Sequence, residues 1–419
     1  MDVCVIGLGY IGLPTAAMFA RHGYSVLGVD VKEEVLEKIL ADGGPAEEPA
    51  LASLVKGALS DGSLCLGGKP EPADVFILCL PTPLREDKKA DLSFVENGME
   101  SILPFIKKGD MVILESTVPP GTTEGLIAEM VRGKGFDPCG DLDLVFAPER
   151  VMPSNILEEL ENLDRVMGGL TPGAAERARD LYAAFVKGRI VLTDATTAEF
   201  VKLVENSYRD VNIAFANELA VLAMGFGIDI WEAVTIANRH PRVNILYPGP
   251  GVGGHCIAVD PYFIIEKSGG SARLMAEARR VNDSMPENVV AEAERLLGDL
   301  KGRKVAVLGI AYKGNVGDFR QSPSLSIIER LEERGAVWKA HDPHVTSSPV
   351  PLVSIEEALE GVDLIIVATD HNVFLELDPD ELGEKVAARK ILDTRHILKR
   401  NEWESAGWEF QYLGDGKRV

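Results

Sequence analysis

The strongest constraint on the fold is a pattern that occurs twice, once near each end of the chain. Residues 3–30 read as strand, glycine-rich turn, helix and strand, in "VCVIGLGYIGLPTAAMFARHGYSVLGVD". A related stretch begins at 305 with "VAVLGIAYKG", and its later segment "RGAVWKAHD" ends at Asp342 as "HGYSVLGVD" ends at Asp30. Strands that are apolar on both faces and alternate with helices indicate buried parallel strands. An α/β protein with two related, doubly wound domains is predicted.

A helical region separates the two repeats. The segment 197–227, "TAEFVKLVENSYRDVNIAFANELAVLAMGFG", has apolar residues at helical spacing and no proline or glycine before Gly225. We expect one long helix there, and a homodimer or larger homo-oligomer that forms through it. The predicted fold is thus two Rossmann-like domains joined by a long central helix, with limits at 1–196, 197–299 and 300–419.

Charge and cysteine content exclude several classes of function. The formal net charge of −22 opposes non-specific binding to nucleic acid or to an anionic membrane, and its simplest interpretation is solubility. The five cysteines are irregularly spaced without a CxxC, which argues against disulfides and a metal site. No apolar run is long enough to span a membrane, and the N-terminus lacks signal-peptide features. A reducing cytoplasm is expected.

The first repeat predicts a dinucleotide site. Gly7, Gly9 and Gly12 have the G-x-G-x-x-G spacing after a strand and before a helix, and Asp30 ends the next strand. The glycines allow a tight turn and close approach of the backbone to a pyrophosphate at the helix N-terminus. Asp30 would bind the ribose diol and repel a 2′-phosphate, so NAD is favoured over NADP. The alternative is a purely structural glycine turn.

Four further residues are assigned to the same cofactor. Tyr10 and Ile11 lie inside the glycine turn, while Thr82 and Thr117 follow two later strands. Ligands of doubly wound sheets bind beyond the carboxyl ends of the strands. The small hydroxyl side chains of Thr82 and Thr117 are therefore expected near the ribose and the nicotinamide. For Thr82, ordinary turn chemistry is the alternative.

A second candidate site is the cysteine loop "PGVGGHCIAVDPYF". Asp260 lies four residues after Cys256, which keeps the two on one side of a helix turn or strand. Such a thiol can attack an aldehyde, and oxidation of the adduct gives a thioester that water hydrolyses. Lys202 and Asn206, spaced i and i+4 on the long helix, can stabilise the oxyanion. The alternatives are a small buried cysteine and a solvated lysine.

The second repeat predicts a different ligand. Ala311 replaces the middle glycine, which argues against a dinucleotide there. Lys313 and Arg320 follow the first strand, and Ser322 and Pro323 are expected to begin a helix. A helix N-terminus with two cations is a reasonable diphosphate site, and two surface cations are the alternative.

Six motifs occur in the same order as in the UDP-glucose/GDP-mannose dehydrogenase family, which the chain resembles over essentially its whole length. They are "GLGYIGLP", "STVPPGTT", "APER", "EFVKLVENSYRDVNIAFANE", "PGVGGHCIAVDP" and "GIAYKGNVGDFRQSP". The resemblance implies an NAD-dependent, four-electron oxidation of the C6 alcohol of a nucleotide sugar to a carboxylate.

The resemblance also implies roles for individual residues. Cys256 matches the nucleophile, Lys202 and Asn206 the oxyanion-stabilising pair, and Thr117 a threonine near the reacting carbon. Asp260 matches a residue that assists proton transfer, and Glu149 of "APER" one that handles water or protons. The general base stays open between Glu149, Asp260 and Lys202, because Pro153 stands where the glucose-oxidising branch has a second glutamate.

For the substrate, the resemblance implies a UDP-sugar whose nucleoside is held by the C-terminal domain. Tyr247, Gly253, Lys313 and Arg320 are expected to bind it, and an arginine near Arg242 to reach the neighbouring subunit's site. The motifs "NRHPRVNIL" and "GGHCIAVDPYF" are most similar to the branch that oxidises UDP-N-acetyl-D-mannosamine. UDP-GlcNAc, UDP-GalNAc or UDP-glucose, a two-electron hydroxyacid-type dehydrogenase, and a non-catalytic sensor are the alternatives.

Overall fold

The computed structural model describes residues 1–45, 48–151 and 155–416, so Pro153 lies outside the described residues. The chain divides into two compact units. Unit 1 comprises Met1–Glu205 and Tyr262–Gly269, and unit 2 comprises Asn206–Pro261 and Gly270–Val419. Two helices, α8 (Ala195–Phe226) and α10 (Asp260–Lys267), contribute residues to both units. The region 197–299 is therefore divided between them.

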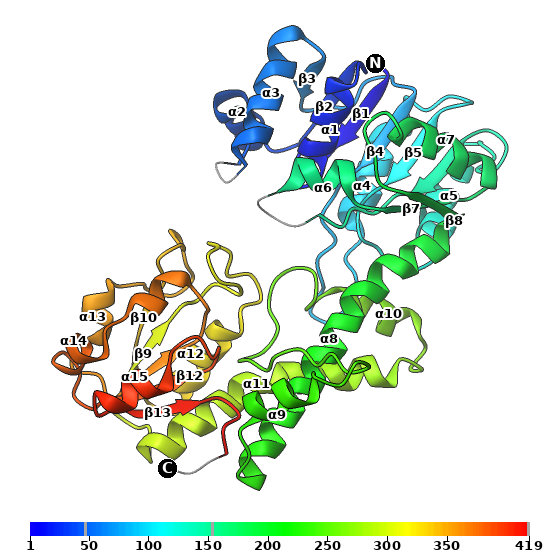
Figure 1. The fold of residues 1–419 in the computed structure, drawn as a ribbon. Coiled ribbons are helices and arrows are strands. Elements are labelled where there is room, and N and C mark those ends of the chain that lie inside the picture. The colour runs from blue at the N-terminus through cyan, green and yellow to red at the C-terminus, as the bar shows by residue number, and fades with distance from the viewer. Residues whose placement is uncertain (46–47, 152–154, 417–419) are drawn as a thin grey trace. The chain divides into compact units, whose positions relative to one another are not determined.

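Unit 1 is built on an eight-stranded sheet (Figure 1). Its spatial order is β3 (Leu64–Gly67), β2 (Val26–Val29), β1 (Val3–Ile6), β4 (Val75–Leu78), β5 (Met111–Leu114), β6 (Asp143–Phe146), β7 (Arg165–Gly169) and β8 (Ile190–Asp194). All neighbouring pairs are parallel except β6 and β7, which are antiparallel. The prediction of a doubly wound sheet is confirmed, and this one reversal is a difference from the expected parallel pattern.

Helices cover both faces of the unit 1 sheet. Side chains of α1, α3, α6 and α7 form one core cluster with the strands, and side chains of α4, α5 and η1 form the other. The helices are α1 (Gly12–Arg21), α2 (Glu33–Asp42), α3 (Pro49–Asp61), α4 (Ser93–Ile102), η1 (Thr123–Ile127), α5 (Ala128–Gly133), α6 (Ile156–Asn162) and α7 (Pro172–Tyr182). This two-sided burial explains why the strands are apolar on both faces.

The antiparallel pairing of β6 and β7 has a local consequence. Phe146 pairs with Gly168 and Val145 with Gly169. If this register is continued by three residues, Glu149 after β6 faces Arg165 at the start of β7. Because β7 runs antiparallel to β6, the first residue of β7 lies beside the end of β6.

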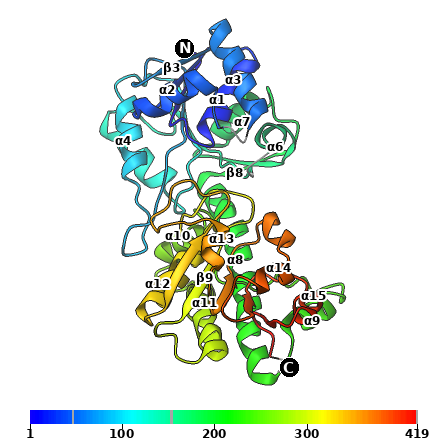
Figure 2. The same cartoon turned by 90° about the vertical axis from the view of Figure 1, so that its left-hand side faces the viewer.

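Unit 2 contains a five-stranded parallel sheet (Figure 2). Its order is β10 (Val337–His341), β9 (Lys304–Leu308), β11 (Leu364–Val367), β12 (Lys390–Asp393) and β13 (Glu409–Tyr412). The helices and short turns are α9 (Ile230–Ala237), α11 (Arg273–Leu297), α12 (Pro323–Glu333), α13 (Ile355–Leu359), η2 (Asn372–Glu376), α14 (Pro379–Gly383) and α15 (Arg400–Ser405). Helices α11 and α12 pack on one face, and α9, α13, α14 and α15 on the other.

The long helix predicted at 197–227 is confirmed as α8, which runs from Ala195 to Phe226. Within unit 2 it is fixed to α11 by buried polar contacts. Arg279 of α11 forms an ion pair with Asp210 of α8, and the amide of Asn282 donates to the Asp210 carboxylate at 2.8 Å. Among the described residues, no helix combines the length and the apolar character needed to cross a lipid bilayer.

Candidate active site

The glycine turn of unit 1 has the geometry that a dinucleotide requires. Gly7 has φ +92°, and a Cβ on Gly12 would lie 1.8 Å from the Gly7 carbonyl oxygen, so both positions need glycine. Gly9 differs, because a Cβ there would meet nothing within 4 Å. Gly9 therefore borders open space at the N-terminus of α1, where no side chain of the described residues caps the helix. These features fit a bound pyrophosphate.

Asp30 lies directly after β2 and is partly exposed. One carboxylate oxygen accepts the amide of Leu8 at 3.0 Å, and the other accepts the amide of Lys32 at 3.0 Å. Because a carboxylate has about four acceptor positions, two amide donors leave capacity for the hydroxyls of a ribose. The backbone of the glycine turn thus fixes the orientation of the Asp30 carboxylate.

The other predicted cofactor residues lie at the ends of neighbouring strands. Tyr10 and Ile11 directly precede α1, and Tyr10 is exposed. Thr82 follows β4 and Thr117 follows β5, and the Thr82 hydroxyl donates to the Thr117 carbonyl at 2.6 Å. This hydrogen bond ties the two loops together, so Thr82 has a structural partner as well as a position at the cofactor edge of the sheet.

Glu149 is buried beyond the end of β6. Its carboxylate forms an ion pair with Arg165 and accepts the Arg150 amide at 2.7 Å. The Arg150 side chain forms an ion pair with Glu205 of α8. Glu205 is one helical turn from Lys202, which is also buried. Within unit 1, the loop that carries Glu149 is therefore anchored to the part of α8 that carries Lys202.

Cys256 is exposed and lies in a turn that leads into α10. Its carbonyl accepts the amides of Val259 at 3.0 Å and Asp260 at 2.8 Å, which places Asp260 one turn further along. The buried carboxylate of Asp260 accepts the side-chain amide of Asn206 at 2.6 Å. The structure thus brings together Cys256, Asp260 and Asn206 in unit 2.

The glycines before Cys256 pack against the second repeat. A Cβ on Gly253 would lie 2.7 Å from the Gln321 carbonyl, and one on Gly254 would lie 2.9 Å from the ring of Tyr312. The Gly254 amide also donates to the Arg320 carbonyl at 2.9 Å. Close packing within the protein therefore accounts for these glycines, and the substrate contact predicted for Gly253 stays a prediction.

The residues that hold the cysteine loop to α8 were missed by the sequence reasoning. The side chain of Asn217 accepts the Gly249 amide at 2.8 Å, and that of Asn212 accepts the Leu246 amide at 3.2 Å. Both asparagines belong to the motif that contains Lys202 and Asn206. The sequence did contain a signal for Asn212 and Asn217, because asparagine is unfavourable inside a long helix unless its side chain has a specific partner.

The predicted diphosphate residues lie between β9 and α12. Lys313 and Arg320 are exposed, and the Arg320 guanidinium donates to both oxygens of Asp318. Ser322 caps α12 by accepting the Ser324 amide, and Pro323 is the first helical residue, as predicted. Arg320 therefore has a fixed orientation from its carboxylate partner, and it remains accessible.

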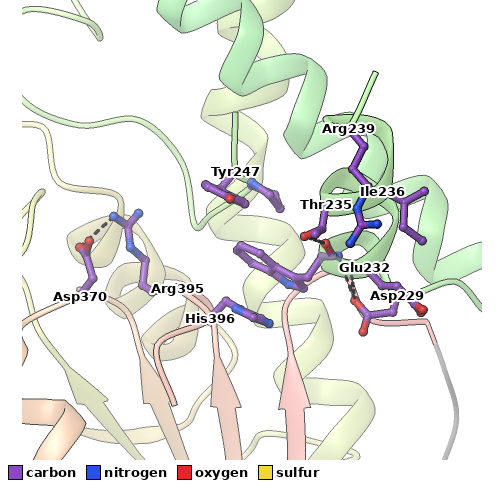
Figure 3. A pocket seen from close by; sticks show the side chains of 11 residues that line it. Asp229, Glu232, Thr235, Ile236, Arg239, Tyr247, Asp370, Arg395 and His396 are labelled. Carbon is purple, nitrogen blue, oxygen red and sulfur yellow. Dashed lines mark hydrogen bonds and ion pairs between the residues drawn. The ribbon is translucent and has the colours of Figure 1, made fainter. Parts of the chain in front are cut away.

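Two further predicted residues lie in the loop after α9. Arg242 is exposed. Tyr247 lines an open cavity of about 720 Å³ in unit 2 (Figure 3). Trp231 in this cavity stacks on Tyr247 and His396 with ring centroids 5.8 and 4.3 Å apart. Arg395, which pairs with Asp370, also borders it. The sequence reasoning missed Trp231 and Arg395 as candidate binding residues.

Comparison with known domain families matches three consecutive regions of the chain. Residues 1–186 match the NAD binding domain of the UDP-glucose/GDP-mannose dehydrogenase family, residues 196–284 its central domain, and residues 306–400 its UDP binding domain. The glycine turn and Asp30 lie in the first region, and Cys256, Asp260 and Asn206 lie in the second.

Individual proteins agree with this assignment. UDP-N-acetyl-D-mannosamine dehydrogenase of Methanocaldococcus jannaschii is 47% identical over 100% of this chain and 97% of the relative. NDP-N-acetyl-D-galactosaminuronic acid dehydrogenase of Ralstonia solanacearum is 42% identical over 94% and 95% of the two chains. The structure of UDP-D-ManNAc dehydrogenase from Pyrococcus horikoshii matches with a TM-score of 0.93 at 41% identity and covers both chains completely. The chain belongs to the UDP-glucose/GDP-mannose dehydrogenase family and is an NAD-dependent dehydrogenase.

Proposed function

We propose that this chain oxidises the C6 alcohol of UDP-N-acetyl-D-mannosamine to the carboxylate of UDP-N-acetyl-D-mannosaminuronate. The observation that carries the proposal is the arrangement of Cys256 one turn before Asp260, whose carboxylate accepts the Asn206 amide. A nucleophilic thiol next to a carboxylate and an amide donor suits a reaction that passes through a covalent acyl intermediate. The names of the relatives in Methanocaldococcus jannaschii and Pyrococcus horikoshii support the mannosamine sugar.

Gly9, the N-terminus of α1 and Asp30 would hold the cofactor. When bound, NAD accepts a hydride in each of the two oxidations. In the first half of the reaction, Lys202 and Asn206 stabilise negative charge on the C6 oxygen as its proton passes to a solvent water. Donors that are buried, like Lys202, or partly buried, like Asn206, stabilise an oxyanion more strongly than water does.

The aldehyde is then captured by Cys256. The sulfur forms a bond to C6, and the carbonyl oxygen becomes an alkoxide that Lys202 and Asn206 stabilise. Oxidation of this thiohemiacetal gives a thioester. A water molecule attacks the thioester carbon, one of its protons passes to Glu149, and the C–S bond breaks to release the carboxylic acid and the Cys256 thiolate. The acid then loses its second proton to solvent and leaves as the carboxylate. In this proposal, Glu149 is the base, while Asp260 orients Asn206.

The nucleotide is proposed to bind to the C-terminal half of unit 2. Exposed Lys313 and Arg320 supply positive charge for the diphosphate. The cavity bordered by Tyr247, Trp231 and Arg395 offers aromatic faces and a guanidinium to the nucleoside end. Lys313, Arg320 and Arg395 belong to the region that matches the UDP binding domain, whereas Trp231 and Tyr247 belong to the region that matches the central domain.

A homodimer through α8 is also proposed. In unit 2, Tyr208, Phe215 and Leu222 recur every seven residues on α8 and are 62%, 51% and 46% exposed. Large apolar side chains at this spacing form one stripe, which favours a helix of a second copy as the partner. The expected role of Arg242 in the neighbouring subunit's site depends on this dimer. The reducing cytoplasm is the proposed compartment, because the irregular spacing of the five cysteines does not suit a disulfide framework.

The test is an assay of NADH formation on a panel of UDP- and GDP-sugars, with mass analysis of the product. About two NADH per UDP-N-acetyl-D-mannosamine and a uronic acid are expected. Release of free aldehyde with one NADH would instead indicate a two-electron dehydrogenase. Binding of sugar nucleotides without NADH formation would indicate a sensor.

Cysteine variants test the covalent step. Cys256→Ser is expected to abolish or severely slow acid formation, because a serine hydroxyl is a much weaker nucleophile than a thiolate at neutral pH. Cys139→Ser, at another exposed cysteine, is the matched control and should leave turnover unchanged. Unchanged turnover of Cys256→Ser would rule out the thioester.

A further inference from the structure

A buried cluster in unit 1 connects Glu149 to side chains that the mechanism above does not use. Arg165 of β7, only 4% exposed, forms the ion pair with Glu149, and its second terminal nitrogen lies 3.9 Å from a carboxylate oxygen of Glu115. Glu115 follows β5 and is 4% exposed. One guanidinium is therefore shared between two buried carboxylates, and at most one of them can be fully neutralised by it.

Two aromatic rings lie beside the guanidinium of Arg165. Its guanidinium carbon lies 5.2 Å from the ring centroid of Tyr182 and 5.9 Å from that of Phe185. The nitrogen that faces Glu115 has no hydrogen-bond partner within the described part of the chain. A guanidinium with aromatic neighbours and one unused donor can change its preferred carboxylate by a small movement.

Glu115 has hydrogen-bond donors that do not depend on Arg165. The hydroxyls of Tyr182 and Thr15 donate to it at 2.6 and 3.1 Å, and the Cys79 thiol donates at 3.1 Å. Burial raises the pKa of Glu115 above its ordinary value, and the nearby guanidinium opposes this effect. Burial and Glu115 together raise the pKa of the Cys79 thiol well above its ordinary value, so Cys79 acts only as a donor.

A carboxylate that has an arginine to itself is a poor base, because the ion pair stabilises its charged form. We propose that Glu115 and Arg165 are positioning residues for Glu149: because Arg165 lies between Glu115 and Glu149, the guanidinium holds the Glu149 carboxylate in place without being its exclusive partner, and Glu149 can take the proton of the hydrolytic water. When Glu149 takes this proton, Arg165 turns its charge toward Glu115. The inference rests on the proposed function, and specifically on Glu149 as the base in thioester hydrolysis.

The pH dependence of kcat tests whether Glu115 and Glu149 share Arg165. Substitution of Glu115 and substitution of Arg165 should move the acidic limb of the pH profile in opposite directions. Glu115→Gln removes the competing charge, so the acidic limb of the profile is expected to shift down by about half a pH unit or more. Arg165→Gln removes the counter-charge, so the limb is expected to shift up by about one unit. The charged or titratable groups around Glu149 are Arg165, Glu115, Cys79 and Tyr182, with Arg150 and its partner Glu205 on the α8 side.

Controls separate this effect from general damage. Arg177→Gln, at an exposed arginine of α7, also removes one positive charge and should leave the profile unchanged. Arg165→Lys should lower kcat about tenfold with KM for the sugar nucleotide within about twofold, because an ammonium cannot contact both carboxylates. Slow hydrolysis should also leave a sugar thioester on Cys256, visible in the mass of the intact protein.

Each outcome decides the proposal. Shifts in opposite directions support it, and shifts in the same direction or no shift in either variant overturn it. If Arg165→Gln does not fold, Glu115→Gln decides alone: a downward shift supports the proposal, and no shift or an upward one contradicts it. Failure of the proposed function looks different, because the wild-type protein would then form no uronic acid, or Glu149→Gln would retain full turnover.

Discussion

The two Rossmann-like repeats begin alike and then diverge. Gly7 and Gly309 both have positive φ, +92° and +90°, at the end of the first strand of each repeat. At the middle position the repeats differ, because Gly9 borders open space and Ala311 is buried. The helix after the first turn has no side-chain cap among the described residues, whereas α12 is capped by Ser322. In the second repeat, protein side chains thus occupy both the middle position and the helix start that the first repeat leaves open.

The aspartates that end the second strands teach the same lesson. Asp30 is partly exposed and accepts two backbone amides. Asp342 is buried and accepts four backbone amides as well as the ring of His371, which is 0% exposed. The residue that is proposed to bind ribose in one repeat is thus a structural acceptor in the other. Shared spacing gives the two repeats a similar local fold, and the neighbouring side chains decide what each aspartate binds.

The largest expected effect tests what the repeats share. A Cβ on Gly12 would lie 1.8 Å from a backbone oxygen of Gly7, and one on Gly314 would lie 2.2 Å from that of Asp370. Gly12→Ala and Gly314→Ala are each expected to lower the free energy of unfolding by about 3 kcal/mol or more, because backbone must move. Thermal and urea unfolding measure this. A stable Gly314→Ala would show that the likeness of the two turns is superficial.

The next prediction tests the middle position of the turn, which is Gly9 in the first repeat and Ala311 in the second. Gly9→Val should weaken NADH binding about 100-fold, since its side chain would occupy the space needed by the pyrophosphate, while Tm should change by only about 2 °C. Fluorescence titration gives the affinity. The matched variant Ala311→Gly should leave NADH affinity unchanged. Equal affinities of Gly9→Val and wild type would place the cofactor elsewhere.

Substitution of Asp30 and of Asp342 is expected to produce a smaller difference between the two repeats, in the preference for NADH over NADPH. Asp30→Asn should shift the preference for NADH over NADPH by about tenfold toward NADPH, because it removes a charge that repels the 2′-phosphate. Asp342→Asn should leave the preference as it is and reduce stability. Ratios of kcat/KM for the two cofactors measure the effect, and an altered ratio in Asp342→Asn would contradict the structural role assigned to it.

The smallest expected effect concerns pH. Burial by itself would raise the pKa of Asp342, but hydrogen bonds from His371 and the backbone outweigh it and hold the pKa below its ordinary value. The folded-state pKa is then lower than the unfolded one, so this stabilisation is complete above about pH 4 and is lost as pH falls further. The difference in unfolding free energy between wild type and Asp342→Asn should therefore shrink by about 1 kcal/mol between pH 6 and pH 3 in urea titrations. An increase in this free-energy difference as the pH falls would contradict the lowered pKa of Asp342.

Local pattern was sufficient for much of this fold. The glycine turns, the strands buried on both faces, the helix α8 and the Ser322–Pro323 start of α12 were all predicted, because each depends on residues that are near one another in the sequence. Cys4 lies inside the first strand, and burial raises the pKa of its thiol to about 11. Cys79 has a similar sequence setting, yet its thiol is a hydrogen-bond donor to Glu115.

Residue spacing and residue type were therefore enough to predict the type of fold and the cofactor, both confirmed, and to predict the residues that carry the chemistry of the site. Tertiary structure alone decided which side chains share a partner. Arg165 faces Glu149 because β7 runs antiparallel to β6, and Glu115 joins them from the end of β5. Strand direction and register depend on contacts between distant residues, and no local pattern of apolar and polar residues records them.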